Sequence, residues 1–143
     1  KEFEVKGGGE EQEGGFLVDI FPAYRDGKLW AVAFEMNAEG YGGEIGVMVG
    51  IDVQADRLLG VGITTHKETP GLGARIKEEG FRKGFVGLDP SGEAKVNADG
   101  GQVDAISGAT ISSRGVCAAV NEAFAFYREN KEEILSRVAD QGS

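Results

Sequence analysis

The spacing of the apolar residues changes once along this chain, and that change limits the folds open to it. From Gly15 to Thr65 apolar residues alternate with other residues, which is the period of a strand with one buried face. From Ser112 onward they recur every three or four residues, which is the period of an amphipathic helix. This order predicts an α+β fold: a mainly antiparallel sheet with helices packed against it, including a long C-terminal helix.

Four strands are expected in the alternating part. The pair Asp26-Gly27 favours a tight turn between the first two, and the later strands are also joined by short connections. Because a parallel pair needs a long crossover, short connections favour antiparallel neighbours. Alternation places three sets of side chains on buried faces: Trp30, Val32, Phe34 and Met36; Ile45, Val47, Val49 and Ile51; and Leu59, Val61 and Ile63.

A loop, a short helix and a hairpin are expected before the last helix. Pro70 and its neighbouring glycines predict a loop. Residues 74–85 fit a short helix with Ile76 and Phe81 facing inward, and residues 92–106 fit a hairpin.

The last helix has a regular apolar stripe, formed by Val116, Ala119, Val120, Ala123, Phe124 and Tyr127. Ile134, Leu135 and Val138 either extend this stripe or form a second helix. Cys117 lies among apolar neighbours, so we expect it to be a buried thiol of the helix.

Charge and composition exclude several classes of partner and cofactor. The formal net charge is −9, which argues against nucleic acid and against docking on anionic lipid. One cysteine and one histidine, His66, can form neither an internal disulfide nor a Cys/His zinc cluster, so no metal site is predicted. No apolar run approaches the length that spans a bilayer.

The first 15 residues, KEFEVKGGGEEQEGG, differ from the rest in composition. Gly and Glu dominate them, which is typical of a flexible leader or a linker remnant. Residues 16–143 are enough for one domain with its own core, and we predict a single domain there.

Residues with hydroxyl groups crowd the start of the last helix, in the stretch DAISGATISS at positions 104–113: Ser107, Thr110, Ser112 and Ser113. One interpretation is a helix N-cap, which needs a single hydroxyl. The other is an anion site. Gly108 and Ala109 leave the backbone bare, the helix start favours phosphate, and Arg114 could add a cation.

Two motifs together resemble a known family. DAISGAT, residues 104–110, resembles the flavinylation motif D-x-x-[ST]-G-A-T of the FMN-binding domain family. HKETPGLGARI resembles that family's E-T-P-G-L-G loop, and GYGGEIGVMVGID resembles its G-Y-G-G-x-I strand. The family includes the G subunit of the Rnf electron transport complex and the C subunit of the sodium-pumping NADH:quinone reductase. The resemblance covers roughly Phe16 to Tyr127.

The resemblance implies a covalent cofactor. Thr110 would carry FMN through a phosphoester bond, made by a separate flavin transferase with FAD as donor. The backbone around Ser107, Gly108 and Ala109, with the N–H groups near Ser112 and Ser113, would solvate the phosphodiester. Asp104 would serve in recognition by the transferase, or else is only a carboxylate at the end of the hairpin.

The E-T-P-G-L-G loop would lie against the flavin. Pro70 would stiffen the loop, Gly71 and Gly73 would let its backbone approach the flat ring, and Leu72 would pack on the ring. Glu68 and Thr69 would either reach the polar edge of the flavin or hold the loop. Tyr41 would stack on the flavin or on the loop, or fill the core. His66 and Lys67 are near enough in sequence to tune the flavin, since a cation near the ring stabilises its reduced forms.

The function implied is that of an electron carrier rather than a stand-alone catalyst. The domain would be part of an ion-translocating, Rnf-type membrane complex, with the other subunits as partners. It would lie on the extracytoplasmic side of a bacterial cell membrane, with its anchor outside this chain. Two alternatives remain: a stand-alone flavin-dependent reductase, and a non-redox binding module in which SGAT is only a helix cap.

Overall fold

The fold is built on an antiparallel sheet. The computed structural model describes the backbone of residues 3–6 and 17–142. The strands in this part of the chain are β1 (Phe3–Lys6), β2 (Leu17–Arg25), β3 (Lys28–Glu39), β4 (Glu44–Asp52) and β5 (Arg57–Thr65). They pair in chain order, each antiparallel to the next, which confirms the predicted meander. The turn between β2 and β3 has positive φ at both Asp26 and Gly27, as a two-residue hairpin requires.

The strand β1 lies within the segment predicted as a flexible leader. Residues 3–6 pair with the first part of β2. Residues 7–15 of that segment fall outside the described residues, and the boundary at residue 16 stays a prediction.

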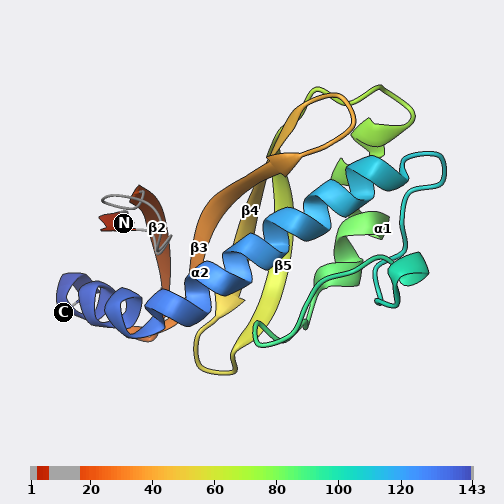
Figure 1. Ribbon diagram of the computed structural model, residues 1–143. Helices are drawn as coiled ribbons and strands as arrows, with labels where there is room; N and C mark the ends of the chain where they lie inside the picture. Colours follow the sequence, from red (N-terminus) through yellow and green to blue (C-terminus); the bar gives the residue numbers. More distant parts are fainter. Residues whose placement is uncertain (1–2, 7–16, 143) are drawn as a thin grey trace.

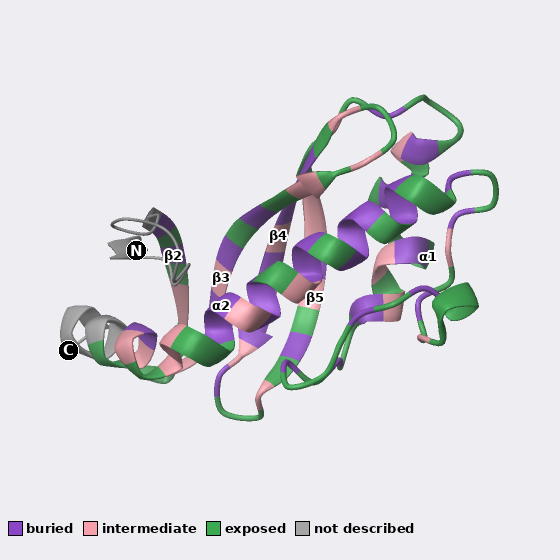
Figure 2. Ribbon diagram, in the orientation of Figure 1, coloured by how far each residue is buried: buried purple, intermediate pink, exposed green. Residues whose placement is uncertain are grey.

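A 33-residue helix, α2 (Thr110–Gly142), crosses one face of the sheet (Figure 1). Its predicted stripe is buried along the contact with the sheet (Figure 2), and Ile134 is buried too, so the stripe extends in one helix. The rings of Phe34 and Phe126 meet edge to face, with centroids 5.1 Å apart. A Cβ on Gly115 would lie 2.6 Å from the Glu39 carbonyl oxygen, so glycine lets α2 approach the end of β3 closely. Cys117 is buried as predicted, and burial raises the pKa of its thiol to about 11.

A bulge changes which residues of β5 face the core. The register shifts between Gly50 and Ile51, which leaves Leu59 as an extra residue on β5. Leu58 and Val61 are therefore buried, and Leu59 is exposed, so the prediction for Leu59 was wrong.

Trp30 also departs from prediction. It is only half-buried, and the Arg25 guanidinium lies 4.1 Å from the centre of its ring. The register between β2 and β3 shifts between Ala23 and Tyr24, which leaves Trp30 as an extra residue on β3 and interrupts the alternation there.

Short helical segments fill the space between β5 and α2. The predicted helix at residues 74–85 consists of η1 (Gly73–Lys77), α1 (Glu79–Arg82) and η2 (Lys83–Phe85). Ile76 and Phe81 are buried in it, as predicted.

The predicted hairpin at residues 92–106 was wrong. That segment holds the 3-10 turn η3 (Asn97–Asp99) and an isolated parallel bridge between Val96 and Val103. The Gly101 N–H bonds to the Val96 carbonyl at 3.0 Å, so the chain closes a tight loop there instead of running back along itself.

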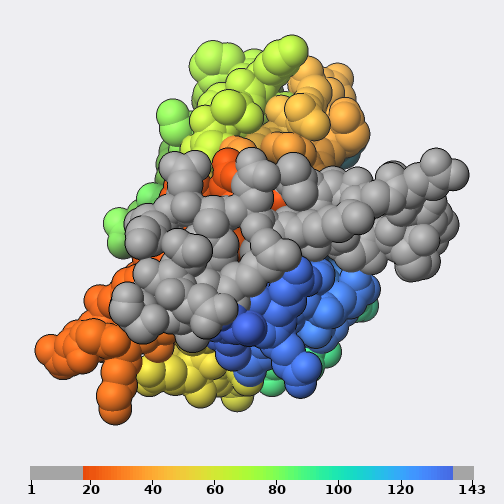
Figure 3. All heavy atoms as spheres, turned by 90° about the vertical axis from the view of Figure 1, so that its left-hand side faces the viewer, coloured from red at the N-terminus to blue at the C-terminus, as the bar shows by residue number. Residues whose placement is uncertain are grey.

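The turn between β4 and β5 packs against the middle of α2, as the yellow and blue atoms show in Figure 3. The Tyr127 hydroxyl donates to Asp56 Oδ1 at 2.7 Å, and Lys131 Nζ lies 2.7 and 2.9 Å from the two oxygens of the same carboxylate. Within the described residues, no helix combines the length and the apolar character needed to cross a bilayer.

Candidate functional site

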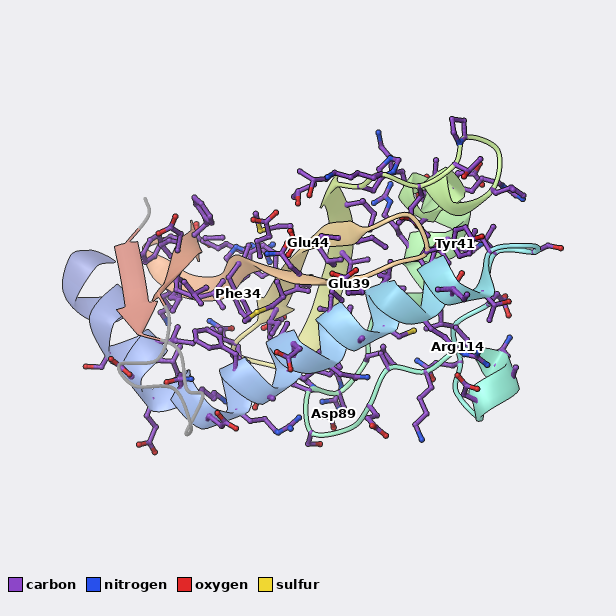
Figure 4. The ribbon with its side chains drawn as sticks, turned by 45° about the horizontal axis from the view of Figure 1, so that its top comes forward. Phe34, Glu39, Tyr41, Glu44, Asp89 and Arg114 are labelled. Atoms are coloured by element: carbon purple, nitrogen blue, oxygen red, sulfur yellow. The ribbon has the colours of Figure 1, made fainter. Side chains whose placement is uncertain are left out.

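A pocket of about 410 Å³ opens beside the first turn of α2. It is formed by three segments far apart in the sequence: the β3–β4 connection, the loop after β5 and the start of α2. Figure 4 shows Tyr41, in the first of these segments, beside the start of the helix. The lining residues are Tyr41, Glu68, Thr69, Leu72, Gly73, Gly108, Ala109, Thr110, Ile111 and Ser112.

The helix starts at Thr110, directly after a tight turn. The Ala109 N–H bonds to the Ile106 carbonyl at 2.9 Å, and Gly108 has φ +80°, a left-handed conformation that glycine adopts without strain. Thr110 is exposed in the first turn of the helix. The N–H groups of a first helical turn lack partners within the helix, and the helix dipole makes this end positive. The surroundings of the Thr110 hydroxyl therefore favour an anion.

Ser113 stabilises the turn and offers nothing to a ligand. Its hydroxyl accepts from the Ile106 N–H and donates to the Ala109 carbonyl, both at 2.9 Å, and its own N–H also bonds to Ala109. Its side chain is fully buried. The N–H of Ser113 itself is therefore not among the free N–H groups of the helix start.

Glu68 joins the three segments of the pocket. Its carboxylate accepts hydrogen bonds from the Tyr41 N–H at 3.0 Å, the Gly42 N–H at 2.8 Å and the Ser112 hydroxyl. These bonds are consistent with the second of the two roles considered for Glu68, that of holding the loop. The Glu68 N–H in turn donates to Nδ1 of His66 at 3.1 Å.

Apolar side chains form the rim of the pocket. Tyr41 is 75% exposed, Leu72 is 47% exposed and Ile111 is 54% exposed. Exposed apolar residues gathered around a pocket are typical of a ligand site. Sequence reasoning missed Ile111, although its position, out of phase with the buried stripe of α2, was a usable signal.

The other predicted residues lie around the pocket and do not line it. Ser107, Pro70 and Gly71 are exposed. Asp104 is also exposed, and its carboxylate accepts a hydrogen bond from the side-chain amide of Asn97.

Arg114, considered above as a cation for an anion site, is engaged elsewhere. Its Nε and Nη2 each lie 2.8 Å from an oxygen of Asp99. This pair raises the pKa of Arg114 and lowers the pKa of Asp99, so the guanidinium already has its anion.

The sequence model for the FMN-binding domain matches residues 40–125, a range that contains every lining residue of the pocket. The G subunit of an ion-translocating oxidoreductase complex from Stutzerimonas stutzeri is 40% identical over 116 residues, which are 77% of this chain and 50% of that protein. The corresponding G subunit from Cereibacter sphaeroides is 36% identical over 125 residues, which are 83% of this chain and 57% of that protein. The chain thus spans about half the length of these curated relatives.

Solved structures share the fold. NqrC from Shewanella oneidensis aligns with a TM-score of 0.66 and 26% identity, over 82% of this chain and 63% of that one. The C subunit of the Na⁺-translocating NADH-quinone reductase from Parabacteroides distasonis aligns with a TM-score of 0.67 over 90% and 75% of the two chains. At 24% identity, the second alignment shows likeness of fold alone.

Proposed function

This chain belongs to the FMN-binding domain family, and from that premise we propose that it is an electron-carrier domain with FMN attached covalently to Thr110. The observation that carries the proposal is the position of this hydroxyl. Thr110 is exposed at the start of a 33-residue helix, inside a pocket with an apolar rim. A phosphate ester fits the helix start, and a flat aromatic ring fits the rim.

The residues of the pocket fit the cofactor. Its volume lies within the roughly 300–1,000 Å³ that small-molecule sites occupy. Gly108 leaves the floor bare, since even an added Cβ would meet only Leu72, at 3.5 Å. Leu72 and Ile111 are placed to cover an apolar ring, and Tyr41 is placed to stack on it. The flavin supplies the redox chemistry, and the protein binds and orients it.

The bond requires a second protein. A flavin transferase with FAD as donor would join the Thr110 oxygen to the phosphorus of the FMN half. The bond from that phosphorus to the AMP half would break in exchange, with AMP as the leaving group, and Thr110 would give up its hydroxyl proton. Asp104, exposed near this site and held by Asn97, is available for recognition by that enzyme.

The names of the relatives support the wider role. They are subunits of an ion-translocating oxidoreductase complex. We therefore assign this domain to electron transfer within such a complex, between other subunits, on the extracytoplasmic side of a bacterial cell membrane. Covalent attachment suits that place because a carrier outside the cytosol cannot readily replace a lost FMN.

The alternatives have less support. A cap hydroxyl accepts from an N–H of the first helical turn, whereas Ser113 accepts from Ile106, before the helix. A reductase needs a free acid or base at its substrate. Glu68, the one charged residue among the described pocket-lining residues, has its carboxylate engaged by three donors.

The test is the intact mass of protein co-expressed with a flavin transferase. We expect an FMN adduct that survives denaturation and maps to Thr110. Thr110→Ala should lose the adduct completely, and Ser107→Ala, which removes a neighbouring exposed hydroxyl, should keep it. An adduct that persists in Thr110→Ala, or that maps to Ser107, Ser112 or Ser113, would refute the assignment.

A further inference from the structure

The buried carboxylate of Glu68 has an unusual environment. The side chain is 6% exposed, and its partners among the described residues are two backbone N–H groups and a hydroxyl. Buried carboxylates are costly unless cations or several donors compensate them. Here the compensating donors come from the β3–β4 connection and from the start of α2. The Glu68 carboxylate is therefore the point where the three segments of the pocket meet.

The glycines of the two motifs crowd around this carboxylate. A Cβ on Gly40 would lie 3.0 Å from Glu68 Oε1, and one on Gly42 would lie 3.0 Å from Oε2. A Cβ on Gly73 would lie 2.8 Å from the Glu68 Cβ. By contrast, an added Cβ on Gly71 would meet nothing within 4 Å. Gly40, Gly42 and Gly73 therefore let the backbone close around Glu68.

The contacts of Glu68 join the three segments that line the pocket. Tyr41, on one side of the rim, is held through its own N–H. Leu72, also on the rim, is four residues after Glu68 in the same loop. Ser112 is two residues after Thr110 in the first turns of α2. A change at Glu68 therefore moves the two rim residues and the attachment site relative to one another.

Glu68 also gives the pocket a negative charge. It is the one charged side chain among the described lining residues. His66 and Lys67, which lie near the loop in sequence and were considered as cations that could tune a flavin, are not among the described lining residues. A fixed negative charge in a poorly hydrated site opposes the addition of electrons to a neighbouring ring.

We propose that Glu68 is a positioning residue that fixes the two sides of the pocket against α2, and that its charge makes the bound flavin harder to reduce. The second half rests on the proposed function, and the first half does not. The two halves are tested by different measurements.

Positioning is measured on the protein without flavin, by hydrogen exchange of the Tyr41 and Gly42 amides. A Gln side chain keeps the size of Glu but has one acceptor oxygen instead of two. Glu68→Gln should therefore speed exchange of at least one of these amides by about tenfold, the cost of one such hydrogen bond. Glu129→Gln, at an exposed position far along α2, should leave both unchanged. Unchanged exchange in Glu68→Gln would overturn the positioning role.

Should Glu68→Gln fail to fold, Ser112→Ala provides the second variant. It removes one of the three donors and leaves the carboxylate and both backbone bonds in place. Exchange at Tyr41 and Gly42 should then rise less than tenfold, because the carboxylate is less firmly held. No rise at either amide would count against the proposal.

The charge is tested by the midpoint potential of the flavin-loaded protein. Glu68→Gln should raise the potential, whereas Glu68→Asp keeps the charge and should leave the potential closer to that of the wild type. Glu68→Asp should nevertheless speed amide exchange, because its carboxylate is one methylene short. Equal potentials in wild type and Glu68→Gln would overturn the electrostatic role. Wild type that takes up no flavin would instead refute the proposed function, while the amide exchange still decides the positioning role.

Discussion

Two pockets of similar size lie at different points along α2, and they differ in chemistry. The pocket at Thr110 measures about 410 Å³, and a second one, near Tyr127 and about 26 Å further along the helix axis, measures about 430 Å³. The second is lined by Ala55, Asp56, Arg57, Asp89, Pro90, Ser91, Tyr127, Arg128 and Lys131.

The charged groups of the second pocket satisfy one another. Asp56 is bound by Tyr127 and Lys131, and Arg57 lies 3.4 Å from Asp89. At the Thr110 pocket the rim is exposed and apolar and the helix start favours an anion, while the one carboxylate among the described lining residues, that of Glu68, is buried and accepts from Tyr41, Gly42 and Ser112. Volume alone therefore does not mark the site. What marks it is an exposed apolar rim beside the start of a long helix.

The largest expected effect comes from filling the first pocket. Gly108→Val places a β-branched residue at φ +80° and directs its side chain toward Leu72, so it should destabilise the fold by about 1–3 kcal/mol and abolish flavin attachment. The matched variant beside the second pocket is Gly92→Val, where the nearest atom to a Cβ is 3.4 Å away. It should retain full attachment by intact mass. Full flavin attachment in Gly108→Val would contradict the claim that the flavin binds in the pocket at Thr110.

The second-largest expected effect is a loss of stability from a change in the second pocket, the one near Tyr127, with no change in flavin attachment. Tyr127→Phe removes a hydrogen bond to the Asp56 carboxylate and should lower the free energy of unfolding by about 0.5–1.5 kcal/mol. Flavin attachment should be unchanged. Tyr41→Phe, at an exposed position, should change stability by no more than about 0.5 kcal/mol in the same thermal unfolding experiment. Loss of covalent flavin in Tyr127→Phe would mean that the pocket near Tyr127 is coupled to the pocket at Thr110.

The smallest effect is the pH dependence of the charged pocket. Hydrogen bonds from Lys131 and then Tyr127 lower the pKa of Asp56 below its usual value. The folded state thus binds this proton less readily than the unfolded state. The resulting stabilisation is present above about pH 4 and is lost as the pH falls through the folded pKa. Because the carboxylate is 45% exposed, we expect well under 1 kcal/mol.

This pH effect is measured by comparing thermal unfolding of wild type and Asp56→Asn between about pH 6 and pH 2. The two should converge at the acid end, where the Asp56 carboxylate of the wild type is protonated. A difference that stays constant down to pH 2 would mean that Asp56 acts through packing rather than charge.

Much of the fold could be predicted because its signals are local. The Asp26-Gly27 turn and the stripe of α2 depend on residues within a few positions of one another, and both were confirmed. Leu59 was misplaced because a bulge is decided by pairing between strands. The hairpin predicted at residues 92–106 failed because the chain closes a tight loop through Gly101 instead.

For the site, the sequence by itself determined which residues to examine, since the motif ending in Thr110 and the loop from Glu68 to Gly73 can be recognised without a structure. Only the tertiary structure decided how those motifs act together. Glu68 meets Gly42 across 26 positions and Ser112 across 44, and no local pattern encodes such distances. Local spacing specifies the period of each element. The contacts between elements depend on how their buried faces pack, and it is those contacts that bring Tyr41, Leu72 and Thr110 to one pocket.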